Sequence, residues 1–211
     1  MTINHGYCDS ATIKAYLGIS VSTYDTQLDE AVNAASRSID NYCQRRFWLD
    51  GTTAARTFVP QTLNQIKFDD DIGDSASVIV KTDASGDGTF ETTWVASDYQ
   101  LLPVNAAFAF PEAEPWTGMR AVGTKTFPWL VNTWLTRLDR VQVTAKWGWP
   151  AVPDAVAQAC LIKASRLFHR KDSPQGIAGF GDFGPVRLSR SEDADVVSLL
   201  GPYRKMPVLV G

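Results

Sequence analysis

The spacing of hydrophobic residues changes twice along this chain, and these changes constrain the fold more than any other feature. Between Asp25 and Arg46, apolar side chains recur every 3 to 4 residues, which is the period of an amphipathic helix. From Thr53 to Ala145, short runs rich in β-branched and aromatic residues are separated by turn signals, as in antiparallel strands. After Pro153 the helical spacing returns. The chain is therefore predicted to form helices, then strands, then helices again.

This order predicts an α+β fold in which a helical bundle core is interrupted by an antiparallel β-rich insertion. We expect residues 1–50 to supply two N-terminal helices of the core and residues 51–147 to form the insertion. Residues 148–211 are expected to complete the core with two C-terminal helices, a loop rich in glycine and phenylalanine, and a tail.

Capping signals predict where the shorter helices begin and end. Asp9 is expected to cap a helix that stops before Gly18, with Tyr16 among its inward-facing residues. Ser191 is expected to cap the last helix, which should end at Gly201-Pro202.

The composition indicates a globular protein. The 211 residues are 45% hydrophobic and 20% charged, and the formal net charge of −3 provides no overall positive field for DNA. No apolar run approaches the ~20 residues that a membrane span requires. The N-terminal stretch lacks the basic region and unbroken apolar run of a signal peptide. We expect synthesis in the cytoplasm and no association with a membrane.

No catalytic apparatus is recognisable. The only histidines are His5 and His169, and a dyad of His169 with Cys160 on one helix would span about 13–14 Å at ~1.5 Å per residue. The serine-hydrolase, zinc-protease and P-loop motifs are absent. Cys8, Cys43 and Cys160 are too scattered for a disulfide framework or a zinc site, and the last two are expected to pack in the core. We expect no catalytic residue, no cofactor and no metal.

Two acidic segments are weighed as cation sites. Residues 83–88 match the first half of a calcium loop, and Glu91 offers one more oxygen, but Trp94 stands where the loop needs an acid. The second segment is the run 69–71 together with Asp74. We interpret the first as a β-turn and the second as a solvated loop between strands. Cation binding is the alternative for both.

The segment from Pro174 to Pro185 combines glycines with aromatic side chains. It contains a G-x-G-x-x-G string, but a dinucleotide site needs a strand before the string and a helix opening within it. Here a predicted helix precedes it and an extended segment follows. We favour a loop or hairpin that docks on a partner through Ile177, Phe180 and Phe183. The alternative is a lid that buries both phenylalanines in the chain's own core.

Both flanks of the β-rich segment resemble the head–tail connector (head-completion adaptor) proteins of tailed bacteriophages. TIKAYLG followed by EAVNAASRSIDNYCQRRF is similar to the opening pair of helices in that family. VTAKWGWPAVPDAVAQACLIKASRLFHRKDSPQGIAGFGDFGPVRLSR resembles its third helix and loop, and DADVVSLLGPYRK resembles its final helix. The β-rich segment is the poorly matched part.

The resemblance implies a structural virion protein of the phage neck rather than an enzyme. In that family the copies form a ring, usually twelve-fold, which sits on the portal protein and extends the DNA channel. The ring offers a platform to the next neck, head-closure or tail protein, and DNA passes without sequence-specific binding. The candidate residues for contact with neighbouring subunits or the portal are Ile177, Phe180, Phe183, Arg187, Arg190, Tyr203, Arg204, Val208 and Leu209.

Two other classes of protein stay open, a nucleic-acid-binding module and a metal-binding module or enzyme. The first requires one continuous basic face formed by Arg166, Arg170, Arg187 and Arg190. The second requires one pocket shared by Asp69, Asp71, Asp83 and Asp87.

Overall fold

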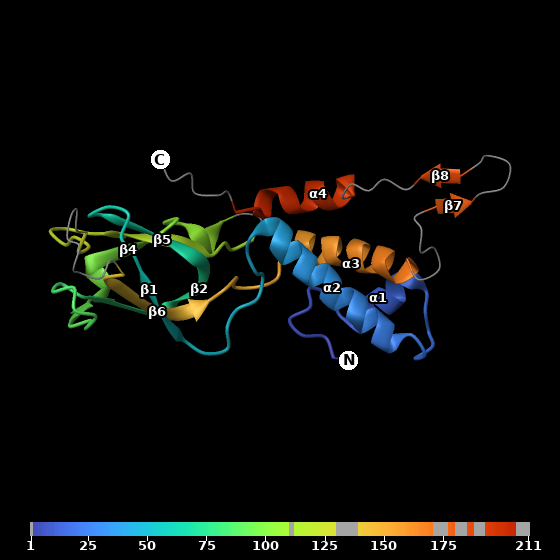
Figure 1. The fold of residues 1–211 in the computed structure, drawn as a ribbon, viewed down its shortest axis with the longest axis horizontal. Coiled ribbons are helices and arrows are strands. Elements are labelled where there is room, and N and C mark those ends of the chain that lie inside the picture. The colour runs from blue at the N-terminus through green and yellow to red at the C-terminus, as the bar shows by residue number, and fades with distance from the viewer. Residues whose placement is uncertain are drawn as a thin grey trace. The chain divides into compact units, whose positions relative to one another are not determined.

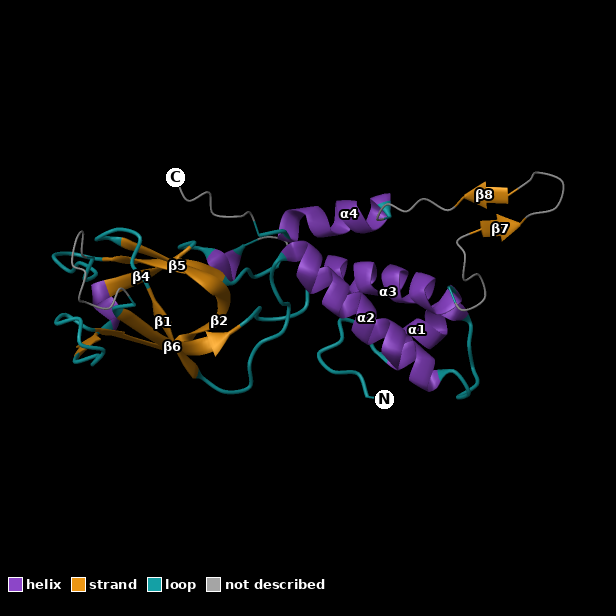
Figure 2. Cartoon of the chain, in the orientation of Figure 1, coloured by secondary structure: helices purple, strands orange, loops and turns teal. Residues whose placement is uncertain are grey.

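The computed structural model describes residues 2–109, 112–129, 139–170, 177–179, 185–187 and 193–205. The chain divides into a helical unit, formed by Met1–Arg46 and Val152–Gly211, and a β unit, formed by Phe47–Ala151 (Figure 1). Helices and antiparallel strands follow one another in the predicted order, which confirms the α+β class (Figure 2). Among the described residues, no helix is long and apolar enough to cross a membrane.

Helix α1 (Ser10–Leu17) begins and ends at the predicted capping residues. The Asp9 side chain accepts a hydrogen bond from the Thr12 amide at 2.6 Å, and this contact holds the pKa of Asp9 below its usual range. Gly18 closes the helix in the left-handed conformation, with φ 67°. The prediction for Tyr16 is wrong, because its side chain is 53% exposed. So short a helix buries only one narrow face, which Ile13 occupies.

Helices α2 (Asp25–Cys43) and α3 (Asp154–His169) form the core of the helical unit, and their faces confirm the predicted periodicity. The fully buried residues of α2 include Leu28, Val32, Ala35 and Ile39. Those of α3 include Val156, Ala159, Cys160 and Ala164. α2 ends at Cys43, three residues before the predicted end at Arg46, because Gln44 adopts a left-handed conformation with φ 55°.

Helix α4 (Ala194–Leu200) packs against α3 and buries Val196 and Leu200. Its cap is Asp193, whose carboxylate accepts a hydrogen bond from the Asp195 amide at 3.1 Å; the expected cap, Ser191, lies outside the described residues. A 3-10 turn, η4 (Gly201–Tyr203), follows directly at the predicted stop.

The β unit is an antiparallel sheet organised around its longest strand, β2 (Gln65–Thr82). The order across the sheet is β1 (Ala54–Phe58), β6 (Val141–Trp147), β2, β5 (Trp116–Ala121) and β4 (Tyr99–Leu102), and β3 (Thr92–Trp94) also pairs with β2. The side chains of β6 alternate between buried and half-buried, as its sequence predicts. β2 pairs with β5 through its first half and with β6 and β3 through its second.

The acidic run 69–71 lies inside β2, so its interpretation as a solvated loop is wrong. The pairing register of β2 shifts between Lys67 and Ile72 and again before Ile79, and such irregularities let one long strand bend between partners. Asp71 is buried within this strand, and Asp70 Oδ2 lies 2.9 Å from Arg56 Nη1. The prediction failed because aspartate is depleted in strands, whereas here the run occupies the irregular stretch between the pairs Lys67–Gly118 and Ile72–Trp116, and the Asp71 carbonyl accepts a hydrogen bond from the Gly148 amide at 2.6 Å.

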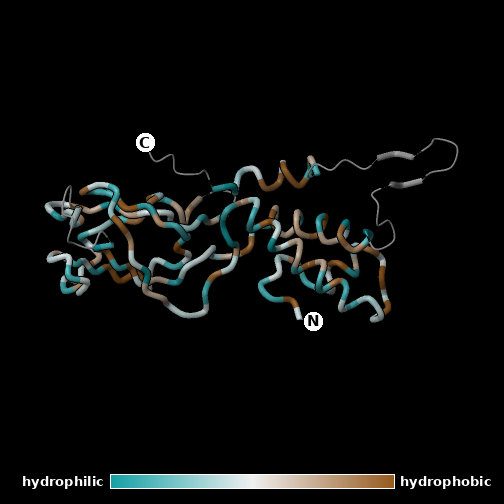
Figure 3. The backbone as a smooth tube through the Cα atoms, viewed as in Figure 1, coloured by the Kyte–Doolittle hydropathy of each residue, from teal (hydrophilic) through white to brown (hydrophobic). Residues whose placement is uncertain are grey.

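Aromatic rings fill the interior of the β unit. Phe58, Phe68 and Trp147 pack with ring centroids 5.2 to 5.7 Å apart. Trp94 and Phe127 stack at 4.8 Å. The indole Nε1 of Trp147 donates to the Ala54 carbonyl at 2.7 Å, so its polar atom is satisfied inside the core. Figure 3 shows the corresponding pattern, with hydrophobic residues interleaved with hydrophilic ones along the strands.

The first and last segments of the β unit are joined to one another. Leu49 pairs with Gly148 in an isolated antiparallel bridge, and the Trp149 amide donates to the Trp48 carbonyl at 3.2 Å. The rings of Phe47 and Trp149 lie 5.1 Å apart. The approach is close enough to require glycine: a Cβ on Gly148 would lie 1.9 Å from the Trp48 carbonyl oxygen, and its φ is +115°.

We predict that Gly148→Ala lowers the stability of the protein by roughly 3 kcal/mol, because the added methyl group collides with backbone and the backbone conformation becomes strained. Chemical denaturation followed by tryptophan fluorescence measures the change. Gly51→Ala is the matched control, since nothing lies within 4 Å of a Cβ built at that position. Equal stability of the two variants would contradict the prediction.

Candidate functional site

The predicted contact residues lie in or just after the Gly-Phe loop, residues 174–185, and in the C-terminal tail, residues 202–211. Phe180, Phe183, Arg190, Val208 and Leu209 lie outside the described residues. The described members are Ile177, Arg187, Tyr203 and Arg204.

Ile177 and Arg187 lie opposite each other in a β-hairpin. Strand β7 (Ile177–Gly179) pairs antiparallel with β8 (Pro185–Arg187), in a register that joins Ile177 to Arg187 and Gly179 to Pro185. These strands form a two-stranded sheet separate from the large one. The hairpin form that the sequence allowed is therefore present, and its backbone pairing brings the two ends of the Gly-Phe loop together.

Tyr203 and Arg204 lie where the chain is anchored to the end of α2. The Lys205 amide donates to the carbonyl of Cys43 at 2.8 Å. The guanidinium carbon of Arg204 lies 5.6 Å from the centre of the Tyr42 ring, within the range of a cation–π contact. This backbone and side-chain pair, which we call the C-terminal anchor, determines where the tail after Lys205 leaves the helical unit.

Two basic residues described in the helical unit form ion pairs within the chain. Arg166 Nη2 lies 2.9 Å from Asp193 Oδ2, and this ion pair joins α3 to the cap of α4. Arg37 Nε lies 2.8 Å from Asp40 Oδ2 on α2. Arg166 is thus paired with an acid of its own chain, which leaves less free charge for the basic face that nucleic-acid binding requires.

The structure also exposes an apolar side chain that the sequence did not single out. Phe108 is 88% exposed at the end of the 3-10 turn η2 (Ala106–Phe108) in the β unit. Val104, one turn earlier, is 52% exposed. A large exposed apolar residue indicates a contact surface when other exposed apolar residues lie near it. The surrounding proline- and alanine-rich stretch, which has neither helical nor strand periodicity, was the available signal.

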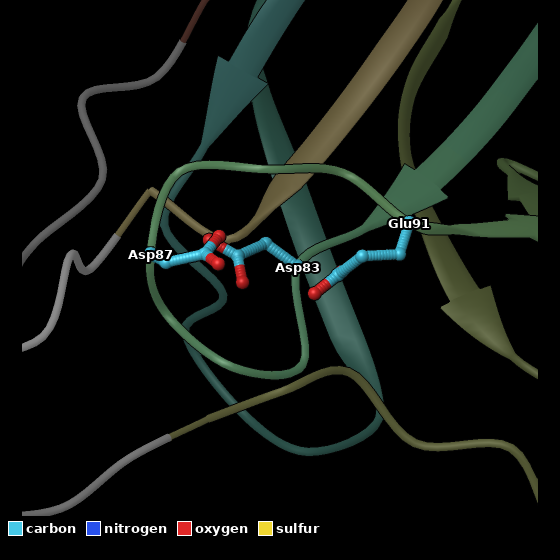
Figure 4. Close-up of side chains that lie close together, drawn as sticks. All are labelled: Asp83, Asp87 and Glu91. Atoms are coloured by element: carbon cyan, nitrogen blue, oxygen red, sulfur yellow. The ribbon is translucent and has the colours of Figure 1, made fainter.

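The acidic turn after β2 gathers three carboxylates, those of Asp83, Asp87 and Glu91 (Figure 4). One oxygen from each lies within 4.8 Å of the others, and they are the only such group of acids, cysteines or histidines in the described parts of the chain. Asp69 and Asp71 do not belong to it, so the shared pocket required by the enzyme interpretation is not formed by the four expected aspartates.

The Asp83 carboxylate is occupied by its own turn. It accepts hydrogen bonds from the Gly86 amide at 2.5 Å, the Gly88 amide at 2.8 Å and the Ser85 hydroxyl at 3.1 Å. Burial alone would raise the pKa of Asp83, but the two amides, with Ser85 and Arg140, lower it below its usual range. The geometry is that of a carboxylate that organises a turn around itself.

Arg140 completes this turn from the opposite side. The residue is buried, its Nε donates to the Asp83 carbonyl at 3.0 Å, and its guanidinium also bonds the Ala84 carbonyl. The Asp83 amide returns a hydrogen bond to the Arg140 carbonyl at 2.9 Å. Glu91 accepts from the Ser85 hydroxyl at 3.0 Å. These contacts support the β-turn interpretation of residues 83–88.

A surface depression of about 350 Å³ lies beside β5 and is lined by Asn64, Gln65, Arg120, Lys125 and the segment 121–123. These lining residues contribute no carboxylate, thiol or imidazole.

No family model matches this chain, and no curated protein matches it. Solved structures do. A chain in the neck of an empty gene transfer agent particle, computed with C6 symmetry, has a TM-score of 0.57 and 18% identity, over 100% of this chain and 96% of that chain. A chain in the neck of a native particle, computed with C12 symmetry, has a TM-score of 0.55 and 17% identity over the same shares. A third chain, from the virion of the native gene transfer agent particle, has a TM-score of 0.54 and 19% identity.

At these identities the likeness establishes the fold. The chain has the fold of a protein from the neck of a phage-like particle, and the resemblance seen in its two flanks is confirmed at that level. The coverage extends over the whole chain, including the β unit, which the sequence resemblance left poorly matched.

We predict that Asp83→Asn destabilises the protein by about 1–2 kcal/mol at pH 7, because an amide cannot accept both backbone hydrogen bonds as a carboxylate does. Since the folded-state pKa is lowered, the stabilisation is complete above the unfolded pKa of ~3.9 and is lost as the pH falls through the folded pKa. The two proteins should therefore converge in stability as the pH approaches about 2.

Thermal unfolding between pH 2 and pH 7 measures this difference, and Glu114→Gln, at an exposed acid of the same unit, serves as the control. A difference that stays constant over the whole range would contradict the role of the charge. A calcium-dependent rise in the wild-type melting temperature that Asp83→Asn abolishes would favour the cation site instead.

Proposed function

We propose that this chain is a structural protein of a phage or phage-like particle, which assembles into a ring at the neck and joins the head to the tail. The observation that carries the proposal is the fold match to neck chains over 100% of this chain and 96% of theirs. A fold alone permits several functions. Here the family suggested by the flanking helices and the particle region named by the structural matches coincide.

The ring is proposed to contain twelve copies and to sit on the portal protein, where it extends the DNA channel. The related neck structures were computed with C6 and C12 symmetry, which supports a cyclic arrangement. A cyclic ring repeats one heterologous contact, in which one patch of a subunit meets a different patch of the next. The other face of the ring would receive the next neck, head-closure or tail protein.

The proposed contact surfaces are the Gly-Phe loop and the tail, each held at its base. The pairing of β7 with β8 closes the loop, and the C-terminal anchor holds Lys205 on α2. Segments that gain order only on binding lose entropy at that moment, so they favour assembly on a template over premature association. Phe108 is a further candidate contact of the β unit.

The function is assembly by surface complementarity rather than turnover, so no catalytic residue or cofactor is assigned. DNA is proposed to pass through the channel without sequence-specific binding. The net charge of −3 supports weak contact with phosphates. So do the ion pairs of Arg166 with Asp193 and of Arg37 with Asp40, which leave less free positive charge. The protein would be made in the host cytoplasm and end in the neck of the virion.

The experiment that tests the proposal is electron microscopy of the purified chain mixed with its cognate portal ring. A second ring stacked on the portal around one channel is the expected result. A chain that stays monomeric and separate from the portal would overturn the proposal. Retention on DNA that weakens steeply with salt would instead favour the nucleic-acid-binding alternative.

We predict that the double substitution Phe180→Ala and Phe183→Ala prevents ring formation while leaving the subunit folded. Truncating an aromatic anchor at an interface costs about 2 kcal/mol or more, which weakens each subunit contact by roughly 30-fold per residue. Light scattering of the portal mixture measures assembly, and a melting curve of the free subunit measures folding.

Phe180→Leu with Phe183→Leu is the control, because it retains apolar bulk and should retain rings. If the alanine variant instead loses much of its melting temperature, the two rings belong to the chain's own core, as in the lid interpretation. If it forms rings normally, the loop is not the contact.

We predict that truncation after Lys205 weakens portal binding by roughly 100-fold or more, because the burial of Val208 and Leu209 is lost at about 1.5–3 kcal/mol for each fully buried side chain. The melting temperature should not change, since the C-terminal anchor is retained. Deleting only Val210 and Gly211 is the matched control. Surface-immobilised portal provides the binding measurement, and equal affinity of the two truncated chains would remove the tail from the interface.

A further inference from the structure

The fold brings together two cysteines that are separated by most of the chain. Cys8 precedes α1, and Cys160 lies in the middle of α3, yet their sulfur atoms are 3.5 Å apart. A disulfide requires about 2.05 Å between the sulfurs, so the two atoms need to approach by about 1.5 Å, which is within reach of side-chain rotation. Both thiols are free in the structure.

We propose that Cys8 and Cys160 form an oxidation site, at which a peroxide converts the two thiols to a disulfide that fastens the N-terminal segment to α3. The proposal stands on the geometry of the helical unit. It does not rest on the proposed function, and it applies to the isolated chain.

The segment that carries Cys8 is already held in place. Residues 2–8, which we call the N-terminal strap, lie along α2: the Asn4 amide donates to Asn33 Oδ1 at 2.9 Å, and Arg37 Nη2 donates to the His5 carbonyl at 2.9 Å. The Tyr7 amide donates to Ser36 Oγ at 3.1 Å, and the Tyr7 hydroxyl bonds Asp40. The strap therefore presents Cys8 to Cys160 without any rearrangement of the helices.

The surroundings of the two cysteines give them different roles, with Cys8 reacting first with the oxidant and Cys160 reacting second. Cys8 is partly exposed, so a small oxidant reaches it first, whereas Cys160 is buried. The hydrogen bond with the Cys8 thiol, together with those from Ser36 and the nearby strap amides, lowers the pKa of Cys160 despite its burial. The same hydrogen bond and burial raise the pKa of Cys8. Cys160 is thus the better thiolate for the second step.

The reaction balances with hydrogen peroxide as the oxidant. Cys8 first releases its proton, and its thiolate attacks one peroxide oxygen; the O–O bond breaks, and the departing hydroxide takes up the released proton as water, so that Cys8 becomes a sulfenic acid. The Cys160 thiolate then attacks the Cys8 sulfur, the S–O bond breaks, and the departing hydroxide takes up the proton that Cys160 had released. Two thiols lose two electrons, and one peroxide becomes two waters.

Cys43 is the internal comparison. It is fully buried in the last turn of α2, so a small oxidant does not reach it as it reaches the partly exposed Cys8. The proposal therefore predicts that oxidation consumes two of the three cysteines of the chain and leaves Cys43 reduced.

The test is to treat the purified full chain with hydrogen peroxide and count free thiols by alkylation under denaturing conditions. We expect the count to fall from three to one, with a linked peptide pair containing Cys8 and Cys160 in the mass spectrum. The bridge closes a loop that includes the entire β unit, so the melting temperature should rise by about 5–15 °C and return on reduction.

Two variants sharpen the result. Cys43→Ser should retain both the linked peptide and the temperature shift, whereas Cys8→Ser, altered at a partly exposed position, should fold and lose both. Three free thiols after oxidation would overturn the proposal. So would Cys8 oxidised to a sulfinic acid beside a free Cys160, or a disulfide that joins two chains through Cys8.

Discussion

The junction between the first and last segments of the β unit is the constraint on which the rest of the structure depends. The bridge between Leu49 and Gly148 and the packing of Phe47 on Trp149 hold the two ends of that unit together. Because its two ends lie side by side, the β unit can be inserted between α2 and α3 in the sequence while these two helices still pack against each other. The close approach is possible only because residue 148 has no side chain.

In each unit, charged side chains bond to groups of the same unit. Asp193 both caps α4 and pairs with Arg166, and Asp83 and Arg140 together bond the backbone of the turn after β2. Charged residues used in this way stabilise the subunit, as the assembly role proposed above requires.

Much of the local structure was predictable because it depends on neighbours in sequence. Asp9 and Gly18 mark the ends of α1, and the alternation in β6 identifies its buried face. The failures came where distant contacts override local preference. The acidic run in β2 has poor strand propensity, and it is extended because the strand pairs with β5 before the run and with β5 and β6 from Ile72 onward. Tyr16 faces solvent although its helix is correctly placed. No hydrophobic periodicity in the surrounding sequence predicted that Phe108 is exposed.

The sequence by itself determined the order of helices and strands, the caps of α1, and the resemblance of the two flanks to phage connectors, because periodicity and capping act over a few residues. Only the tertiary structure decided which distant residues meet. Nothing in the sequence connects Cys8 with Cys160. In the folded chain the N-terminal strap lies along α2 and brings the two sulfur atoms together. The physical reason is that such contacts arise from the packing of α2 on α3, which no local spacing in the chain encodes.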